Sequence, residues 1–299
     1  MNVSITGDLI KEQALAIYET QPSPKKPMHF SSGWLYCFMK RHDLTSRRLH
    51  GERASLSQDE VDDGRSKLLL ETSRYSKEDI YNMDESALFY KRAPDTTISK
   101  TATQGLKKDK TRITVALAAN CSGSDKLPLL FIGKAARPRC FGNKSAEQLC
   151  FIYRFNRKAW MTITIFSEWI SKFNAMMATM GRSVLLVLDN ASSHKIEEVE
   201  LTHVRVLMLP PNATSALQPM DAGVIAAFKR YFKRKQLRHA IQRVNRVPDD
   251  KLKDFKKLGS KIYAVDQLTA MNWAKSAWDD VTPETIKNCW LHTGIVQAD

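Results

Sequence analysis

The chain has 299 residues, 43% of them hydrophobic, and a formal net charge of +14. Its length and hydrophobic content allow a substantial buried core, and its charge indicates an anionic partner, with nucleic acid ahead of a membrane surface. No apolar stretch approaches the ~20 residues of a membrane-spanning helix, which argues against a membrane protein. Five cysteines without a C-x-x-C pair argue against a structural zinc site or a disulfide framework.

The first 54 residues predict a small helical unit. The stretch "GDLIKEQALAIYET" forms an amphipathic helix that "QPSPKKP" breaks, and a second helix over residues 31–42 places Trp34 and Phe38 on one face. This second helix suits a DNA groove, although a core helix whose cations are merely solvated fits the pattern equally well. Four cations at and beyond its end are expected to contact DNA: Lys40, Arg41, Arg47 and Arg48.

Residues 55–77 are polar and acidic and predict a linker helix, after which residues 78–299 form an α/β domain. Three strands joined by hairpin-like turns come first, at residues 80–83, "TRITVALAAN" and "KLPLLFIG". A helix over "TIFSEWISKFNAMMATM" leads into a strand at Val184–Leu188, and a fifth strand covers residues 204–209. A helix beginning around Met220 then runs into a basic segment.

Carboxylates stand at the ends of these predicted elements. Asp189 follows an apolar run typical of a strand buried on both faces, Asp84 sits on the first strand after its alternating residues, and Asp221 opens the last helix. Alone, Asp189 is better explained as a cap of the following turn. Three carboxylates in equivalent places instead favour a site, because functional groups gather at the carboxyl ends of strands in α/β sheets. The element order is that of the ribonuclease-H-like fold.

Most of the positive charge lies in two clusters. Residues 229–261 carry +10 of the net charge, and residues 25–53 carry another +5. Each cluster alone is as well explained by a solvated helix face, but two clusters flanking a neutral core favour a nucleic-acid enzyme. Four cations in the segment that continues the last helix are expected to bind DNA: Lys229, Arg230, Lys233 and Arg234.

Several motifs occur in a recognisable order. "YNMDESALFY", "RKAWMT", "LLVLDNASSHK", "LPPNATSALQPMDAGVIAAFK" and "AWDDVTPETIKNCW" closely resemble the DDE endonuclease domain of the pogo/Tigger group of DNA transposases. That group includes the domesticated proteins jerky and centromere protein B. "SSGWLYCFMKRHDLTSRRLHGE" resembles the second helix-turn-helix of the centromere-protein-B-type DNA-binding domain. The resemblance therefore covers almost the whole chain.

The resemblance implies a ribonuclease-H-like mixed sheet flanked by helices, preceded by a small all-α helix-turn-helix domain. It implies that Asp84, Asp189 and Asp221 are the metal-binding and catalytic triad, holding two Mg²⁺ or Mn²⁺ ions through oxygen ligands. Three supporting groups are candidates beside the triad: Glu85, Asn190 and His194. The alternative, that these three residues are ordinary polar neighbours of the acids, is left open.

The implied function is metal-dependent cleavage and strand transfer of double-stranded DNA in the nucleus. A domesticated DNA-binding protein without physiological cleavage stays open, and a nuclease acting on RNA is disfavoured by the flanking motifs. A homodimer on DNA is also left open. Relatives carry another helix-turn-helix before the one seen here, so the chain is expected to bind duplex DNA with weak sequence preference and steep salt dependence.

Overall fold

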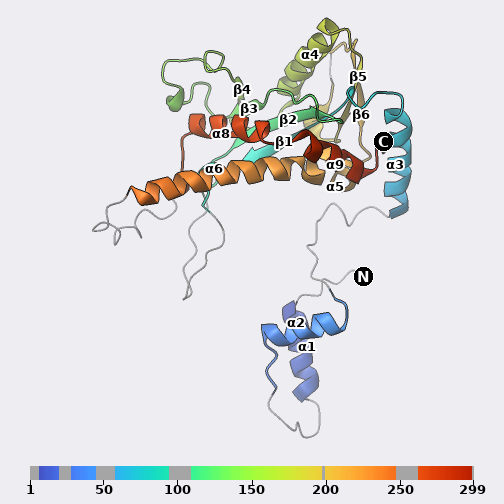
Figure 1. Ribbon diagram of the computed structural model, residues 1–299, viewed down its shortest axis with the longest axis vertical. Helices are drawn as coiled ribbons and strands as arrows, with labels where there is room; N and C mark the ends of the chain where they lie inside the picture. Colours follow the sequence, from blue (N-terminus) through green and yellow to red (C-terminus); the bar gives the residue numbers. More distant parts are fainter. Residues whose placement is uncertain are drawn as a thin grey trace. The chain divides into compact units, whose positions relative to one another are not determined.

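The computed structural model describes residues 7–19, 28–44, 58–93, 109–196, 199–246 and 262–297 (Figure 1). The chain divides into two compact units, Met1–His50 and Gly51–Asp299. Within the described ranges, no helix has both the length and the apolar character needed to cross a membrane.

The first unit contains the two predicted helices, α1 (Gly7–Glu19) and α2 (Ser32–Arg41). The hydroxyl of Ser31 caps α2 by accepting the N–H of Trp34 at 3.2 Å. The Trp34 ring stacks on Phe38 with 5.2 Å between centroids, and Phe30 meets Trp34 edge-on at 4.7 Å. The same aromatic rings line a hollow together with Ile10 of α1. The apolar face of the second helix is therefore turned toward the first.

The second unit is built on a six-stranded mixed sheet. Its strands are β1 (Ile80–Leu88), β2 (Ile113–Asn120), β3 (Leu130–Gly133), β4 (Ile152–Phe155), β5 (Val184–Leu188) and β6 (Val204–Met208), in the spatial order β4-β3-β2-β1-β5-β6. Strands β1, β2 and β3 pair antiparallel, while β5 lies parallel to β1 and to β6. This arrangement is the ribonuclease-H-like sheet that the sequence predicts.

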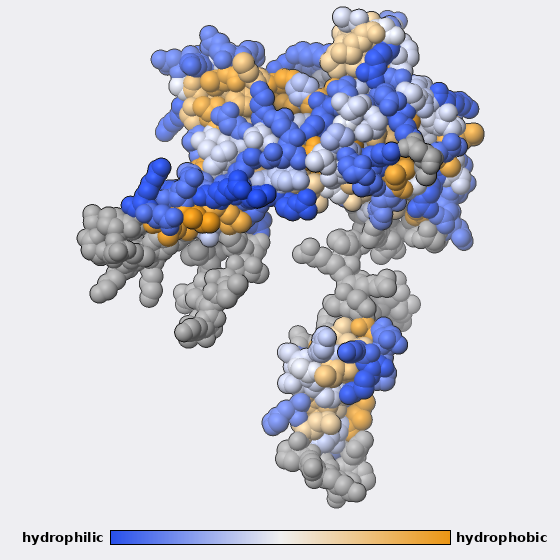
Figure 2. Space-filling view, viewed as in Figure 1, coloured by the Kyte–Doolittle hydropathy of each residue, from blue (hydrophilic) through white to orange (hydrophobic). Residues whose placement is uncertain are grey.

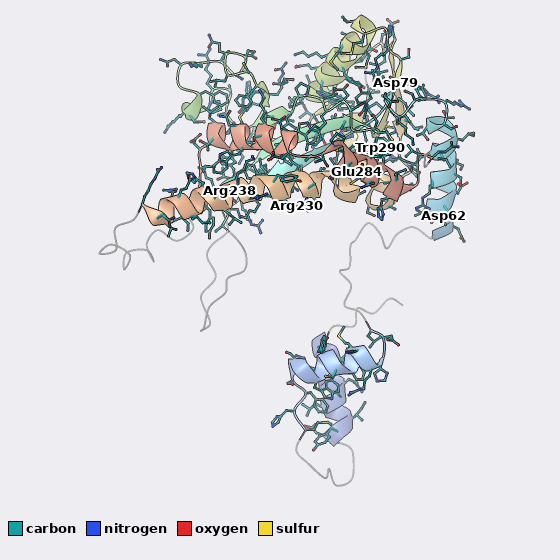
Figure 3. The ribbon with its side chains drawn as sticks, viewed as in Figure 1. Asp62, Asp79, Arg230, Arg238, Glu284 and Trp290 are labelled. Atoms are coloured by element: carbon teal, nitrogen blue, oxygen red, sulfur yellow. The ribbon has the colours of Figure 1, made fainter. Side chains whose placement is uncertain are left out.

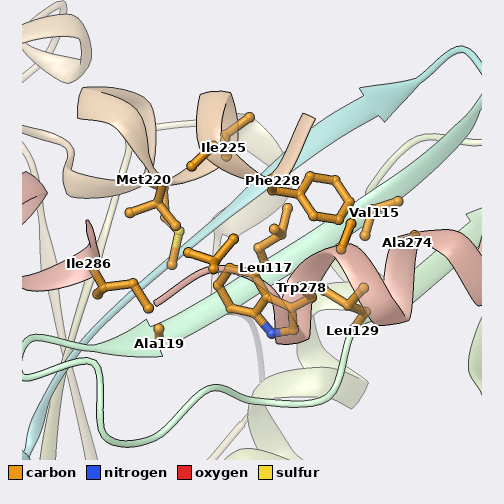
Figure 4. Close-up of a cluster of buried hydrophobic side chains, with 14 of the residues drawn as sticks. Val115, Leu117, Ala119, Leu129, Met220, Ile225, Phe228, Ala274, Trp278 and Ile286 are labelled. Carbon is orange, nitrogen blue, oxygen red and sulfur yellow. The ribbon is translucent and has the colours of Figure 1, made fainter. Parts of the chain in front are cut away.

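Alternating side chains give the sheet two buried faces. On β2, Val115 and Leu117 belong to one apolar cluster, whereas Ala116 and Ala118 belong to the other. The first cluster packs against α6 (Ile225–Asn245), α8 (Gln267–Asp279) and α9 (Pro283–Thr293), as the close-up in Figure 4 shows. The second packs against α4 (Ile163–Thr179). Helices thus cover the sheet on both sides (Figure 1).

Helix α3 (Gln58–Thr72), which occupies the segment predicted as a linker, packs on this second unit. Leu68 is buried in the first apolar cluster, and the Thr72 hydroxyl donates to the carbonyl of Ile295 at 2.6 Å. Gly64 lies so close to Pro210 that an added Cβ would stand 2.9 Å from its ring. The helix is therefore fixed to the sheet domain by specific contacts.

Three details differ from the sequence prediction. Strand β1 carries Asp84, as predicted, but extends well past it to Leu88. Residues 89–112 join β1 to β2, so these two strands do not form a tight hairpin. Strand β4 was not predicted, because only a short stretch of alternation marks it and its side chains at Ile152 and Phe155 remain exposed at the sheet edge.

Candidate active site

Asp84 lies inside β1 and is only 9% exposed. It shares a strand face with Ile80 and Leu88, the face that packs toward α6. Burial raises the pKa of Asp84 well above its usual value, and the charges of Asp221, Glu85 and Asp189 raise it further. The charges of the other two predicted acids therefore both act on Asp84, although the three acids come from separate elements.

Asp221 is positioned by a buried side chain of β1. It lies in η3 (Met220–Val224), a single π-helical turn that leads directly into α6. The fully buried Asn82 accepts the N–H of Met220 at 2.9 Å and donates from Nδ2 to the carbonyl of Val187 at 2.8 Å. One amide thus joins β1, β5 and the turn that carries Asp221. Sequence reasoning missed Asn82, whose signal was a polar residue inside an apolar strand two positions before Asp84.

Asp189 follows β5 and is held by an imidazole. His194, in η2 (Ser192–His194), lies with Nδ1 2.6 Å from Oδ1 of Asp189, and the same oxygen accepts the N–H of Ala191 at 3.2 Å. Burial by itself raises the pKa of Asp189, but the hydrogen bond and charge of His194 lower it by more. Asp189 therefore differs from Asp84, because a cation already stabilises its ionised form.

His194 also reaches the residue next to Asp84. Its Nε2 lies 3.0 Å from Oε1 of Glu85, and its ring packs 4.9 Å from that of Phe166. Burial lowers the pKa of His194, but the bonds to Asp189 and Glu85 raise it to about 10. The imidazolium thus bridges the two strands that carry the acids. The third supporting candidate, Asn190, donates to the carbonyl of Leu209 at the end of β6.

The cations predicted on α6 occupy different environments. Lys229 is affected by two of the acids: desolvation lowers its pKa, and the charges of Asp221 and Asp84 raise it in part. Lys233 donates to Oε1 of Gln236 at 2.9 Å. Arg230 and Arg234 are exposed, and Figure 3 shows Arg230 on the flank of the helix. A hydrophilic strip follows α6 along its length (Figure 2).

The remaining predicted cations belong to the first unit. Lys40 and Arg41 are exposed in the last turn of α2. Arg47 and Arg48 lie outside the described residues.

The three acids offer a divalent ion the oxygen ligands it prefers, and the mutual repulsion that raises the pKa of Asp84 is the repulsion a cation relieves. The carboxylates of these three acids do not converge tightly in this structure. Among the residues that the structure describes, no three His, Cys, Asp or Glu side chains are grouped tightly enough to hold a metal ion. The donor chemistry therefore fits an ion, while ion binding requires the acids to draw together.

Comparison with known proteins places this chain in a family. A family model described as DDE superfamily endonuclease matches residues 110–290. The chain belongs to the DDE endonuclease superfamily. The matched range includes Asp189 and Asp221, while Asp84 lies before it. A second model, the Tc5 transposase DNA-binding domain, matches residues 1–48.

Named relatives of this chain include CENP-B homolog protein 2 of Schizosaccharomyces pombe, 32% identical over 98% of this chain and 57% of the relative. Tigger transposable element-derived protein 4 of Mus musculus is 29% identical over 98% of this chain and 54% of its own length. The chain therefore spans a little more than half of these relatives. Among solved structures, the Mos1 transposase paired-end complex with the left transposon end is 12% identical, with 98% of this chain and 89% of that chain covered and a TM-score of 0.42.

Proposed function

We propose that this chain binds double-stranded DNA and cleaves its phosphodiester bonds in the manner of a transposase, with strand transfer as the second step. The observation that supports this most strongly is the buried Asn82 amide, whose bonds to Val187 and Met220 join the three elements that carry Asp84, Asp189 and Asp221. Residues 1–54 would bind DNA, and residues 78–299 would carry out the cleavage chemistry. Residues 55–77 would connect these two domains.

In this proposal Asp84, Asp189 and Asp221 hold Mg²⁺ or Mn²⁺, two ions in the loaded site. Bound ions of this kind supply charge neutralisation at the phosphodiester oxygens and acidify a nucleophile. The protein's own groups act by position. His194 fixes the carboxylate of Asp189 and holds Glu85, and Asn82 fixes the turn that carries Asp221. Lys229, near Asp221 and Asp84, would meet the phosphate backbone at the site.

DNA binding in the proposal rests on phosphate contacts. Lys40 and Arg41 are exposed at the end of α2, and Arg230 and Arg234 are exposed on α6, so both units present cations to an anionic duplex. A DNA substrate in turn implies action in the nucleus. Two copies acting together on DNA would be needed if both ends of a mobile element are to be joined.

The test is nicking of a supercoiled plasmid by the purified chain. We expect relaxed and linear products with Mg²⁺ or Mn²⁺, none with EDTA, and none from Asp189→Asn with metal present. The matched control is Asp63→Asn, since Asp63 is an exposed aspartate on α3 that pairs with Lys67. This control should nick like the wild type.

The second candidate, a DNA-binding protein that no longer cleaves, makes the opposite prediction in the same assay. It would shift DNA in a gel and leave the plasmid supercoiled at every metal concentration. The intact set of three aspartates and the held position of Asp189 favour cleavage over this reading.

A further inference from the structure

A hollow of about 240 Å³ lies beside the acids, between β1, the start of β2, η2 and the loop that precedes α4. Its lining includes Glu85, Ser193, Arg112 and Trp160. Glu85 follows Asp84 in β1, and Ser193 precedes His194 in η2, so the hollow opens next to the elements that hold the acids. Neither Arg112 nor Trp160 has a role in the function proposed above.

The loop that carries Trp160 is braced from several sides. Asn156 Oδ1 accepts the N–H of Lys158 at 3.1 Å and that of Trp160 at 3.2 Å, and its Nδ2 donates to the Trp160 carbonyl at 2.6 Å. The Thr114 hydroxyl donates to the carbonyl of Ala159, which is fully buried. The backbone at Trp160 is therefore fixed to β2 and to its own turn.

The side chain of Trp160 is only partly covered by the protein. Trp160 remains 53% exposed, although tryptophan is the side chain that gains most from burial. A large aromatic surface held outward by a rigid loop is a feature of recognition sites, because little conformational entropy is lost when a flat ligand stacks on it.

Two cations accompany the ring. The guanidinium carbon of Arg112 lies over the indole, 5.2 Å from its centre, and Lys158 Nζ lies over it at 5.4 Å. Arg112 also donates to the carbonyl of Lys158 at 3.4 Å, which links the two ends of the cluster. An aromatic surface flanked by positive charge complements a ligand that combines a flat ring with an anion, and a nucleotide has both.

We propose that Trp160, Arg112 and Lys158 form a binding platform for an unpaired nucleotide of the DNA strand at the acid site. The base stacks on the part of the Trp160 ring that stays exposed, while Arg112 and Lys158 contact the adjoining phosphates. A fully paired duplex keeps its bases stacked on each other and offers none to the indole. The platform therefore selects DNA that is opened next to the bond to be cut. This inference rests on the proposed function, since it assumes DNA at the acids.

The experiment compares two labelled DNAs by fluorescence anisotropy in EDTA, so that no strand is cut. One is a paired duplex, and the other is the same duplex with a short unpaired flap. We expect Trp160→Leu to weaken binding of the flap DNA about tenfold, the size of a lost base–aromatic stack, and to leave duplex binding unchanged. Trp160→Phe should retain most of the affinity. Arg112→Gln and Lys158→Gln should flatten the salt dependence for the flap DNA.

The matched control is Phe155→Leu, since Phe155 is equally exposed at 53%, lies on neighbouring β4 and does not line the hollow. It should change neither affinity. Equal weakening on both DNAs by Trp160→Leu, or no weakening on either, would overturn the platform. Suppose that the wild-type chain nicks plasmid and binds both DNAs, and that Trp160→Leu binds both DNAs with the same affinity. That result would overturn the platform and leave the proposed function standing. A wild-type chain that binds neither DNA at low salt would overturn the proposed function as well.

Discussion

His194 lies with Nδ1 2.6 Å from Oδ1 of Asp189, and its other nitrogen lies 3.0 Å from Glu85. The imidazole is fully buried, so it joins the strands of two acids without contact with solvent. Removing it leaves two partly buried carboxylates without their cation. We expect His194→Gln to lower the free energy of unfolding by about 3 kcal/mol, as measured by urea denaturation.

The matched control is His292→Gln, because His292 is exposed at the end of α9. Its effect should stay within about 0.5 kcal/mol. A His194→Gln chain as stable as the wild type would show that the bridge between Asp189 and Glu85 is not what holds these strands together.

Asn82 makes a second connection between the elements that carry the acids. Replacing it with Ala leaves the Met220 N–H and the Val187 carbonyl without their partner in a buried position. The expected loss in the free energy of unfolding is about 1–3 kcal/mol. Plasmid nicking should fall further than stability explains, because the turn carrying Asp221 is released. Asn272→Ala, at an exposed amide on α8, is the control and should affect neither measurement.

The architecture of the second unit can be predicted well from the sequence, because its strands have strong patterns of apolar residues. The run Val184–Leu188 is buried throughout, as an uninterrupted apolar strand should be, and the alternation over Ile113–Asn120 matches two buried faces. The order of strands and helices follows from that pattern, and so does the position of each acid within it.

What could not be read from the sequence depends on contacts between distant residues. Asn82 and Met220 are far apart in the chain, so only the fold reveals that they are bonded. The bridge from His194 to Glu85 has the same character. The exposed Trp160 resembles any core aromatic in sequence, and the brace that turns it outward comes from Asn156 and Thr114.

The cations of α6 should differ in their contribution to DNA binding. Arg230 and Arg234 are exposed, whereas Lys233 is bonded to Gln236 within the protein. Neutralising both arginines to Gln should weaken binding equally across DNA sequences and reduce the salt slope by about 2. Lys233→Gln should leave that slope nearly unchanged. Equal slopes for the double variant and the wild type, measured by anisotropy from low to moderate salt, would remove α6 from the DNA interface.

Asp266 tests the pH dependence of the fold away from the acids. Partial burial raises its pKa, but bonds from the N–H and hydroxyl of Thr269 lower it by more, so its folded pKa lies below the ordinary value. A lowered carboxyl pKa contributes stability above the unfolded value, and that stability is lost as pH falls through the folded value.

Asp266→Ala should therefore cost about 1 kcal/mol at neutral pH, the usual worth of a helix cap, and less as pH falls below about 4. Asp266→Asn keeps a capping oxygen for α8 and should recover most of the loss at neutral pH. Urea denaturation across this pH range measures the difference. A cost of Asp266→Ala that does not change with pH would show that the ionised carboxylate adds nothing.

The most direct test is the affinity of the folded chain for Mn²⁺, measured by calorimetric titration without DNA. The three acids are proposed to draw together around divalent ions, so Asp84→Asn, Asp189→Asn and Asp221→Asn should each weaken binding roughly tenfold or more. Asp63→Asn, on the exposed face of α3, should bind like the wild type. Unchanged Mn²⁺ affinity in all three variants would contradict the account, because the ions would then be held elsewhere or not at all.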